Sequence, residues 1–212
     1  VGKYFETGSF ILTDSYISVI EAIKHASYHF NKKPEIIWIS SEEFEKNPKK
    51  LAELKNLDGV IIPGGFGTRG IEGKIKAIEY CRKNNIPFLG ICLGMQLAVV
   101  EFSRNVCSLE DANSSEFNKN SKNPVIDVME EQKKLIKENR YGGTMRLGGY
   151  SCNLKEGTFS FNAYKNKEIS ERHRHRYEVN NKYIDILEKN GLTIAGKNKE
   201  MNLVEIIEIK NH

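Results

Sequence analysis

One cysteine in the sequence stands where it could act as a nucleophile. Cys92 lies in the segment Gly90-Ile91-Cys92-Leu93-Gly94, at the end of an apolar run over 86–91. A free thiol has a pKa of about 8.5, and the N-terminus of a helix favours its anion through unpaired N–H groups and the helix dipole. The apolar run predicts a buried strand and residues 93–102 predict a helix, with no ordinary loop between them. Cys92 is therefore predicted to occupy a sharp strand-to-helix turn, the thiol counterpart of a nucleophile elbow.

The other three cysteines are interpreted as core residues. Free cysteine is among the most buried residue types, so a core position is the default explanation for any cysteine. Cys81 fits the apolar face of a helix predicted over 71–81, and Cys107 and Cys152 stand in no motif. No Cys-x-x-Cys pair occurs, which leaves a zinc ribbon or a redox motif without support. The strand–turn–helix context favours catalysis over burial for Cys92 alone.

A glycine-rich segment follows another predicted buried strand, at 60–62. It reads Pro63-Gly64-Gly65-Phe66-Gly67. In an open α/β fold it should lie at the carboxyl edge of the sheet, where such folds bind ligands. One of its N–H groups, paired with the N–H of Leu93, could hold the oxyanion of a tetrahedral intermediate, and losing one such donor costs about 3–4 kcal/mol. The alternatives are a simple turn or a phosphate loop, but the Walker A pattern is absent from the sequence.

Short apolar runs alternate with helical patterns along the chain. This alternation predicts an α/β fold in three layers, with a mostly parallel central sheet flanked by helices. Strands are expected at 36–39, 60–62, 86–91, 144–154, 172–179, 192–195 and 203–209, and helices at 16–30, 43–54, 71–81, 93–102 and 180–187. Asp14 or Ser15 could cap the first helix. Residues 113–123 are loop-like, and the charge run at 130–140 predicts a solvated helix or a mobile insert.

Composition limits the classes of protein to consider. The chain has 212 residues, 39% of them hydrophobic, with a net charge of +4 and a pI of about 8.7. The charge is too small to suggest nucleic-acid binding, and no apolar run approaches the roughly 18 residues of a membrane helix. Without an export signal, reduced thiols and a cytoplasmic location are expected. The start at Val1, with no initiator Met, predicts a single domain over 1–212 that is truncated at both ends.

Two motifs together resemble the class I glutamine amidotransferases. They are the glycine-rich segment at 63–67 and the elbow Gly90-Ile91-Cys92-Leu93-Gly94-Met95-Gln96. Four blocks narrow the resemblance to the CTP synthase family: Gly64-Gly65-Phe66-Gly67-Thr68-Arg69-Gly70, Ala112-Asn113-Ser114-Ser115-Glu116-Phe117, Gly143-Thr144-Met145-Arg146-Leu147-Gly148 and Glu171-Arg172-His173-Arg174-His175-Arg176-Tyr177-Glu178-Val179-Asn180. The blocks occur in the family's order and span most of the chain, and the last one is the most specific.

The resemblance implies a reaction and a binding site. Cys92 would attack the side-chain amide of L-glutamine, forming a glutamyl thioester and releasing ammonia. Gly65 and Leu93 would supply oxyanion or backbone contacts. The resemblance further assigns the lining of the substrate pocket to Gly94, Met95 and Gln96.

Two charged residues complete the implied site. Glu116 would contact the α-amino group of the substrate and Arg176 its α-carboxylate. This division suits a zwitterionic substrate, because arginine matches a carboxylate through its planar fork.

The basic block at 172–176 allows other interpretations. In a strand, alternate residues face opposite sides, so His173 and His175 would share one face and the three arginines the other. Two histidines at this spacing can bind a metal, but the sequence places no acidic or cysteine partner clearly beside them. The small net charge speaks against nucleic acid. A satisfied polar strand with one functional member agrees with the role implied for Arg176, and no metal is expected.

The family's general base is not in the sequence. A class I amidotransferase needs a histidine oriented by a glutamate, in a pattern like Gln-Phe-His-Pro-Glu. Residues 204–212 resemble the segment just before the strand that carries it, and His173, His175 and His212 all lack the matching context. We expect that the base follows residue 212 or that the chain is a naturally truncated copy. These 212 residues alone should then be nearly inactive.

The resemblance also implies partners outside this chain. An amidoligase domain, with ATP and magnesium as cofactors, would use the ammonia to convert UTP to CTP, and the full-length protein would form a homo-oligomer. No cofactor is expected in the glutaminase part itself. Two alternatives remain. Another Cys-elbow hydrolase, such as a peptidase, would leave Glu116 and Arg176 unexplained, and a non-catalytic regulatory or binding module would keep the glutamine pocket without the base.

Overall fold

The computed structural model describes residues 1–3, 6–7, 10–11, 14–128, 132 and 145–209. The chain folds as two compact units, residues 1–94 and 95–212. The expectation of one domain over 1–212 stays a prediction. Apart from Gln132, the charge run at 130–140 lies outside the described residues. Within the described ranges, no helix is both long and apolar enough to cross a membrane.

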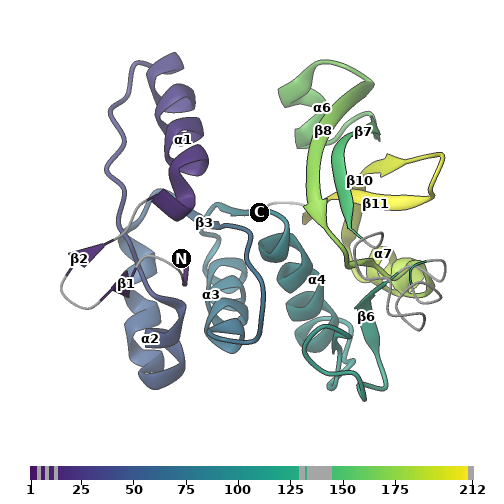
Figure 1. Ribbon diagram of the computed structural model, residues 1–212, viewed down its shortest axis with the longest axis horizontal. Coiled ribbons are helices and arrows are strands. Elements are labelled where there is room, and N and C mark those ends of the chain that lie inside the picture. Colours follow the sequence, from purple (N-terminus) through teal and green to yellow (C-terminus); the bar gives the residue numbers. More distant parts are fainter. Residues whose placement is uncertain (4–5, 8–9, 12–13, 129–131, 133–144, 210–212) are drawn as a thin grey trace. The chain divides into compact units, whose positions relative to one another are not determined.

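The first unit alternates helices with short strands (Figure 1). Its elements are β1 Glu6–Thr7, β2 Phe10–Ile11, η1 Asp14–Tyr16, α1 Ile17–His29, α2 Ser41–Lys46, η2 Pro48–Asn56, β3 Val60–Ile62, α3 Ile71–Asn84 and β4 Phe88–Gly90, followed by the start of α4 Leu93–Asn105. The strands β1 and β2 pair antiparallel, and β3 and β4 pair parallel. The helices predicted at 43–54, 71–81 and 93–102 are confirmed, the first of them as α2 followed by the 3₁₀ helix η2.

The β3–β4 pair aligns the ends of its two strands. Ile62 pairs with Gly90 at the carboxyl end, and the ladder continues where Ile91 N–H donates to the Ile62 carbonyl at 2.9 Å. Helix α3 buries Ile71, Ile75, Ile78 and Cys81, the apolar face predicted for it. The core interpretation of Cys81 is therefore confirmed.

Three expectations for the first unit are wrong. Residues 36–39 form no strand, because the only strand-like pairing in this part of the described chain is a single bridge between Gly2 and Ser40, and Ile37 is 53% exposed. The helix predicted at 16–30 is confirmed as α1, but neither Asp14 nor Ser15 caps it, because Tyr16 holds the N-cap position without a side-chain hydrogen bond. The strand predicted at 86–91 forms, but Leu89 is 54% exposed rather than buried.

The second unit contains most of α4, two sheets and short helices (Figure 1). After α4 come β5 Asn113–Ser114, β6 Pro124–Asp127, β7 Arg146–Leu154, α6 Phe159–Tyr164, β8 Glu168–His175, β9 Glu178–Val179, η4 Asn181–Tyr183, α7 Ile184–Lys189, β10 Leu192–Asn198 and β11 Leu203–Ile209. The strands predicted at 144–154, 192–195 and 203–209 and the helix at 180–187 are confirmed within a few residues of their ends, the helix as η4 followed by α7. The strand predicted at 172–179 is interrupted, because a bend at residues 176–177 separates β8 from β9.

Two sheets organise this unit. One has the order β11-β10-β7-β8 and is antiparallel throughout. The other has the order β5-β6-β9, with β5 and β6 parallel and β6 and β9 antiparallel. The α/β class is confirmed. Parallel pairing occurs at β3–β4 and β5–β6, whereas the largest sheet among the described strands is antiparallel.

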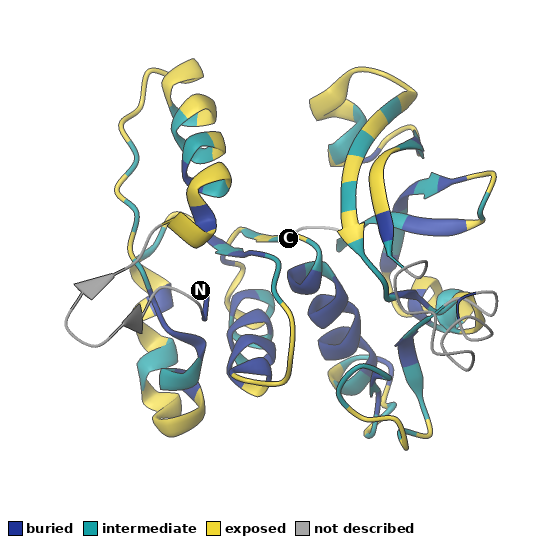
Figure 2. Cartoon of the chain, viewed as in Figure 1, coloured by how far each residue is buried: buried dark blue, intermediate teal, exposed yellow. Residues whose placement is uncertain are grey.

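Burial follows the amphipathic patterns of the sequence in both kinds of element. Along α4, Leu97, Val99 and Val100 are fully buried. Strand β8 alternates between exposed and half-buried residues, which Figure 2 shows as a striped arrow. The strand therefore presents one face to the interior and one to solvent, as its period of two residues requires.

Candidate functional site

The turn between β4 and α4 places Cys92 in an unusual backbone conformation. Strand β4 ends at Gly90 and α4 begins at Leu93, so only two residues connect them. Cys92 has a φ of +53°, in the left-handed region that residues other than glycine rarely adopt. Such strain collects at functional sites, where the surrounding structure enforces it. The sharp turn predicted from the sequence is confirmed.

A close backbone approach enforces this turn. A Cβ built on Gly94 would lie 2.0 Å from the carbonyl oxygen of Ile62, which no real side chain could accommodate. The first turn of α4 therefore passes directly against β3. On its other side the thiol meets the glycine-rich loop, since a Cβ on Gly64 would lie 3.4 Å from the Cys92 Cβ and 3.7 Å from its Sγ. The loop at 63–67 thus lies against Cys92.

Backbone N–H groups lie near Cys92, at the start of α4 and in the glycine-rich loop. Leu93 is the first residue of α4, and the first N–H groups of a helix find no acceptor within it. Gly65 follows β3 in the loop beside the thiol and is half-buried. The structure thus places Gly65, Leu93 and Gly94 near Cys92 in the first unit. Their roles as oxyanion or substrate contacts stay predictions.

A buried lysine near the thiol was missed in the sequence. Lys74 is 0% exposed, and its Nζ has no hydrogen-bond partner among the described residues. Burial lowers its pKa to about 7 with help from Lys3, while the Cys92 thiol acts in the opposite direction. A cation this near would favour a thiolate. The clue was its spacing, three residues after Ile71 and four before Ile78, which puts Lys74 on the apolar face of α3.

Glu116 and Arg176 are both anchored to strand β6 in the second unit. Glu116 comes two residues after β5, and the preceding Ser115 N–H donates to the Ile126 carbonyl of β6 at 2.9 Å. Arg176 lies in the bend between β8 and β9, and β9 pairs with β6 on its other side. Because β6 is the middle strand, it holds both segments in one sheet.

The pKa of the Tyr177 side chain depends on both of these charges. The pKa of Tyr177 is raised, first by burial and then by the negative charge of Glu116. Arg176 lowers it, both through its positive charge and through a side-chain hydrogen bond. Glu116 and Arg176 therefore lie within electrostatic reach of the same hydroxyl. The structure brings these two predicted site residues together, although their contacts with a substrate stay predictions.

Met95 and Gln96 begin the second unit on α4. Met95 is half-buried, and Gln96 is 5% exposed. The side-chain Nε2 of Gln96 donates to the Tyr177 carbonyl at 2.8 Å. The amide of Gln96 therefore holds the bend that carries Arg176. That both residues line a substrate pocket stays a prediction.

Strand β8 has the two faces that the sequence predicted, but only for four residues of the basic block. His173 and His175 are half-buried on one face, and Arg172 and Arg174 are exposed on the other. Arg176 is not on the exposed face, because it is half-buried in the bend after β8. The two imidazoles contact each other, with His173 Nδ1 2.8 Å from His175 Nε2.

Acidic partners stand beside these histidines, contrary to the expectation from the sequence. His173 Nε2 lies 3.5 Å from a Glu205 oxygen, and His175 Nδ1 lies 3.4 Å from a Glu178 oxygen. The buried guanidinium of Arg146 bridges both carboxylates, at 3.2 Å to Glu178 and 2.8 Å to Glu205. Both carboxylates are therefore already paired with a cation, whose single charge balances one of them. Within the described ranges, no group of three or more His, Cys, Asp or Glu side chains is arranged to hold a metal ion.

Burial sets the protonation of this cluster. Together with the charges of His173 and Arg146, it lowers the pKa of His175 to about 4. It also lowers the pKa of His173. The pKa of Glu178 is raised to about 8 by burial and by the neighbouring Glu205, against the opposing charge of Arg146. Both histidines are therefore neutral at pH 7.

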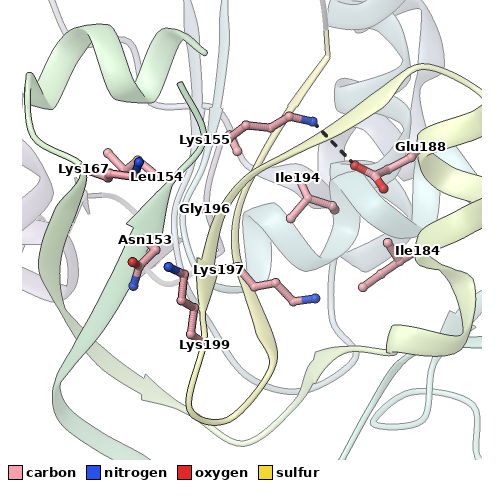
Figure 3. Close-up of a pocket in the computed structure, with 11 residues that line it drawn as sticks. Asn153, Leu154, Lys155, Lys167, Ile184, Glu188, Ile194, Gly196, Lys197 and Lys199 are labelled. Carbon is pink, nitrogen blue, oxygen red and sulfur yellow. Dashed lines mark ion pairs between the residues drawn. The ribbon is translucent and has the colours of Figure 1, made fainter. Parts of the chain in front are cut away.

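A cavity of about 360 Å³ lies elsewhere in the second unit (Figure 3). Its walls come from β7, β10 and α7 and include the ion pair between Lys155 and Glu188. None of the predicted site residues lines it. Its lysines are surface residues without a convergent buried polar group, so we place the candidate site at Cys92 and at the Glu116–Arg176 pair.

The chain matches the family model described as glutamine amidotransferase class-I over residues 11–212. It is 53% identical to CTP synthase from Sulfurisphaera tokodaii over 212 residues, and 53% identical to CTP synthase from Methanocaldococcus jannaschii over 217 residues. Both alignments cover 100% of this chain, but only 38% and 39% of the relatives. The chain thus spans less than half the length of these curated relatives.

A solved structure has the same fold. The glutaminase domain of the Trypanosoma brucei CTPS, with bound acivicin, superposes with a TM-score of 0.86 at 37% sequence identity. The alignment covers 98% of this chain and 78% of that one.

The close approach at Gly94 can be tested with a single methyl group. In Gly94→Ala the new Cβ would meet the Ile62 carbonyl at 2.0 Å, so the first turn of α4 must shift. We expect the free energy of unfolding in urea to fall by about 1–3 kcal/mol. The control is Gly64→Ala, whose Cβ would make only ordinary contact at 3.4 Å. Equal urea midpoints for the two variants would contradict the backbone contact.

The buried neutral His175 predicts a pH dependence of stability. Its pKa falls from 6.5 to about 4 in the fold, so the free energy of unfolding should decrease as pH drops through this interval, by up to about 3 kcal/mol. Glu178 acts in the opposite direction, because its raised pKa favours the fold at low pH. In His175→Asn the free energy of unfolding in urea should decrease less as the pH falls, because the buried imidazole is gone. The other charged groups of the cluster, Arg146, His173, Glu178 and Glu205, remain. Identical pH profiles for wild type and variant would contradict a neutral, buried His175.

Proposed function

Because the chain belongs to the class I glutamine amidotransferases, and among them to the glutaminase domains of CTP synthase, we propose that it hydrolyses L-glutamine with Cys92 as the nucleophile. The observation that carries the proposal is the conformation of Cys92, whose φ of +53° presents the thiol at the N-terminus of α4. Helix N-termini favour a thiolate, and the elbow keeps it accessible beside the glycine-rich loop.

The proposed reaction proceeds in two halves. The thiolate attacks the side-chain amide carbon, and the N–H groups of Leu93 and Gly65 stabilise the oxyanion that forms. The C–N bond then breaks, a general acid protonates the leaving nitrogen, and ammonia departs from a glutamyl thioester. Water hydrolyses the thioester through a second oxyanion, giving glutamate and regenerating Cys92. The buried ammonium of Lys74 supports the thiolate electrostatically.

The charge pair in the second unit supports a free amino acid as substrate. Glu116 and Arg176 both act on the Tyr177 hydroxyl, so an anion and a cation lie close together. An α-amino group and an α-carboxylate need these two charges side by side, and arginine suits the carboxylate. A peptidase acting within a chain would meet neither group, so glutamine is favoured over a peptide substrate.

The wider reaction is also part of the proposal. Ammonia from this domain would pass to an amidoligase domain, which converts UTP to CTP with ATP and Mg²⁺. No residue of this chain is assigned to either cofactor. The length of the relatives named CTP synthase supports such a partner domain. This chain covers only 38% of one of them, so that relative is about 2.6 times as long as this chain. We further infer a homo-oligomer for the full-length protein and a cytoplasmic location, where reduced thiols are the default.

A non-catalytic module is the second candidate function. It is favoured because His173 and His175 are both engaged in hydrogen bonds and are not proposed as the general base. His173 and His175 bond to each other, and His175 also contacts the Tyr177 carbonyl, so neither is proposed as the general base. We therefore propose that these 212 residues alone hydrolyse glutamine slowly, since losing a triad base reduces rates by several powers of ten.

Covalent labelling tests the nucleophile. We expect an electrophilic glutamine analogue, such as a chloroketone, to modify Cys92 in the uninterrupted gene product, because the thiol is the attacking group. Peptide mass spectrometry would locate the label, and excess L-glutamine should slow its addition. Cys92→Ser is the control and should remain unlabelled. If the label is absent from Cys92, and no His-x-Glu segment follows His212, the binding module replaces the enzyme.

Steady-state kinetics test the carboxylate contact. Arg176→Ala should raise the KM for glutamine by about 10-fold to 100-fold, the effect of losing a charged hydrogen bond. The matched control is Arg174→Ala, two residues away on the exposed face of β8, which should leave KM unchanged. An unaltered KM in Arg176→Ala would remove this residue from the pocket.

A further inference from the structure

The bend that carries Arg176 is held by one carbonyl group. Arg176 and Tyr177 form the link between β8 and β9. The Tyr177 carbonyl is 2.8 Å from Gln96 Nε2 and 3.1 Å from His175 Nδ1. One contact comes from α4 and the other from the end of β8, so the Tyr177–Glu178 peptide, one residue beyond Arg176, is tied to two separate elements.

This carbonyl determines the tautomers of the two histidines. A carbonyl oxygen only accepts hydrogen bonds, so Nδ1 of His175 must carry a hydrogen. In a neutral imidazole the other nitrogen is then an acceptor, and His175 Nε2 accepts at 2.8 Å from His173 Nδ1. His173 therefore also carries its hydrogen on Nδ1. The hydrogen bonds run in one direction, from His173 to His175 to the bend.

The other end of this series of hydrogen bonds, at His173, agrees with the assigned tautomers. His173 Nε2 is left as an acceptor, and it faces a Glu205 oxygen at 3.5 Å, which is longer than an N–H···O hydrogen bond. It is buried without a hydrogen-bond partner among the described residues. The Tyr150 ring packs edge-on against the His173 ring, with the two centroids 5.5 Å apart. The Arg146 guanidinium carbon lies over the Tyr150 ring, 4.3 Å from its centroid. These contacts hold the imidazole pair on the side away from the bend.

We propose that His175, supported by His173, is a positioning residue that orients Arg176 for the carboxylate of the substrate through the Tyr177 carbonyl. The inference rests on the proposed function for the role of Arg176. His175 itself touches no reacting atom. Its effect is to limit the rotation of the Tyr177–Glu178 peptide at the end of the bend, so that the guanidinium of Arg176 meets a carboxylate without first ordering the bend. Orienting a binding group in advance reduces the entropy lost on binding.

Kinetics of two variants in the uninterrupted gene product test this role. His175→Leu removes the donor, and the KM for glutamine should rise by about fivefold to tenfold, the size of one lost hydrogen bond, with kcat changed less than KM. His175→Asn places an amide N–H near the position of Nδ1 and should restore most of the KM. CTP formation supported by ammonium chloride should be equal in all variants, because it bypasses the glutaminase site.

A double variant shows whether His175 acts through Arg176. In an Arg176→Ala background, adding His175→Leu should leave KM where Arg176→Ala alone puts it, because the group being oriented is gone. If Arg176→Ala raises the KM but His175→Leu does not, the inference about His175 is overturned and the proposed Arg176 contact stands. The same holds if the effects of the two substitutions on KM are additive, or if His175→Asn fails to restore the KM. An unchanged KM in Arg176→Ala would overturn both the inference and the proposed contact.

The tautomers can be measured without any activity. Nitrogen-15 spectra of the histidine side chains at pH 7 should show both His173 and His175 protonated on Nδ1. A hydrogen on Nε2 of His175 would overturn the inference whatever the kinetics show, because the ring could then not donate to the Tyr177 carbonyl.

Discussion

The backbone contact between the first turn of α4 and strand β3 is the constraint on which the candidate nucleophile depends. Because Gly94 lies directly against the Ile62 carbonyl, the chain must turn from strand to helix within two residues. Cys92 occupies that turn and takes the left-handed conformation that the geometry demands. The strain is retained because the parallel ladder between β3 and β4 fixes one side and α4 fixes the other.

The second unit solves a different physical problem, the orientation of a long charged side chain. Arginine has many rotamers, and an unsupported bend would add backbone freedom to them. Here Gln96 and His175 share the Tyr177 carbonyl, while Arg146 pairs with the buried carboxylates behind the imidazole pair. A single guanidinium between two carboxylates leaves no uncompensated buried charge once Glu178 holds a proton. The cluster that resembled a metal site in the sequence is thus organised around an arginine.

Some features followed from local sequence because their causes are local. The spacing of Ile71, Ile75 and Ile78 predicts one buried helical face, and the alternation in β8 predicts which basic residues are exposed, since both depend only on helix and strand periods. The turn at Cys92 was predictable because glycines flank it between a strand and a helix. The motif blocks were sufficient to indicate the family.

Other features were decided by tertiary structure, because they depend on partners far away in the chain. The apolar run at 36–39 forms no strand, since a strand needs a neighbour to pair with and the described chain supplies only a bridge at Ser40. Lys74 lies near Cys92 only because α3 packs beside the elbow. Glu116 and Arg176, 60 residues apart, both act on Tyr177 because β6 pairs with β5, which Glu116 follows, and with β9, which Arg176 precedes. The sequence by itself determined the turn at Cys92 and the family, and the packing of distant segments within each unit decided which charged groups lie near Cys92 and near Tyr177.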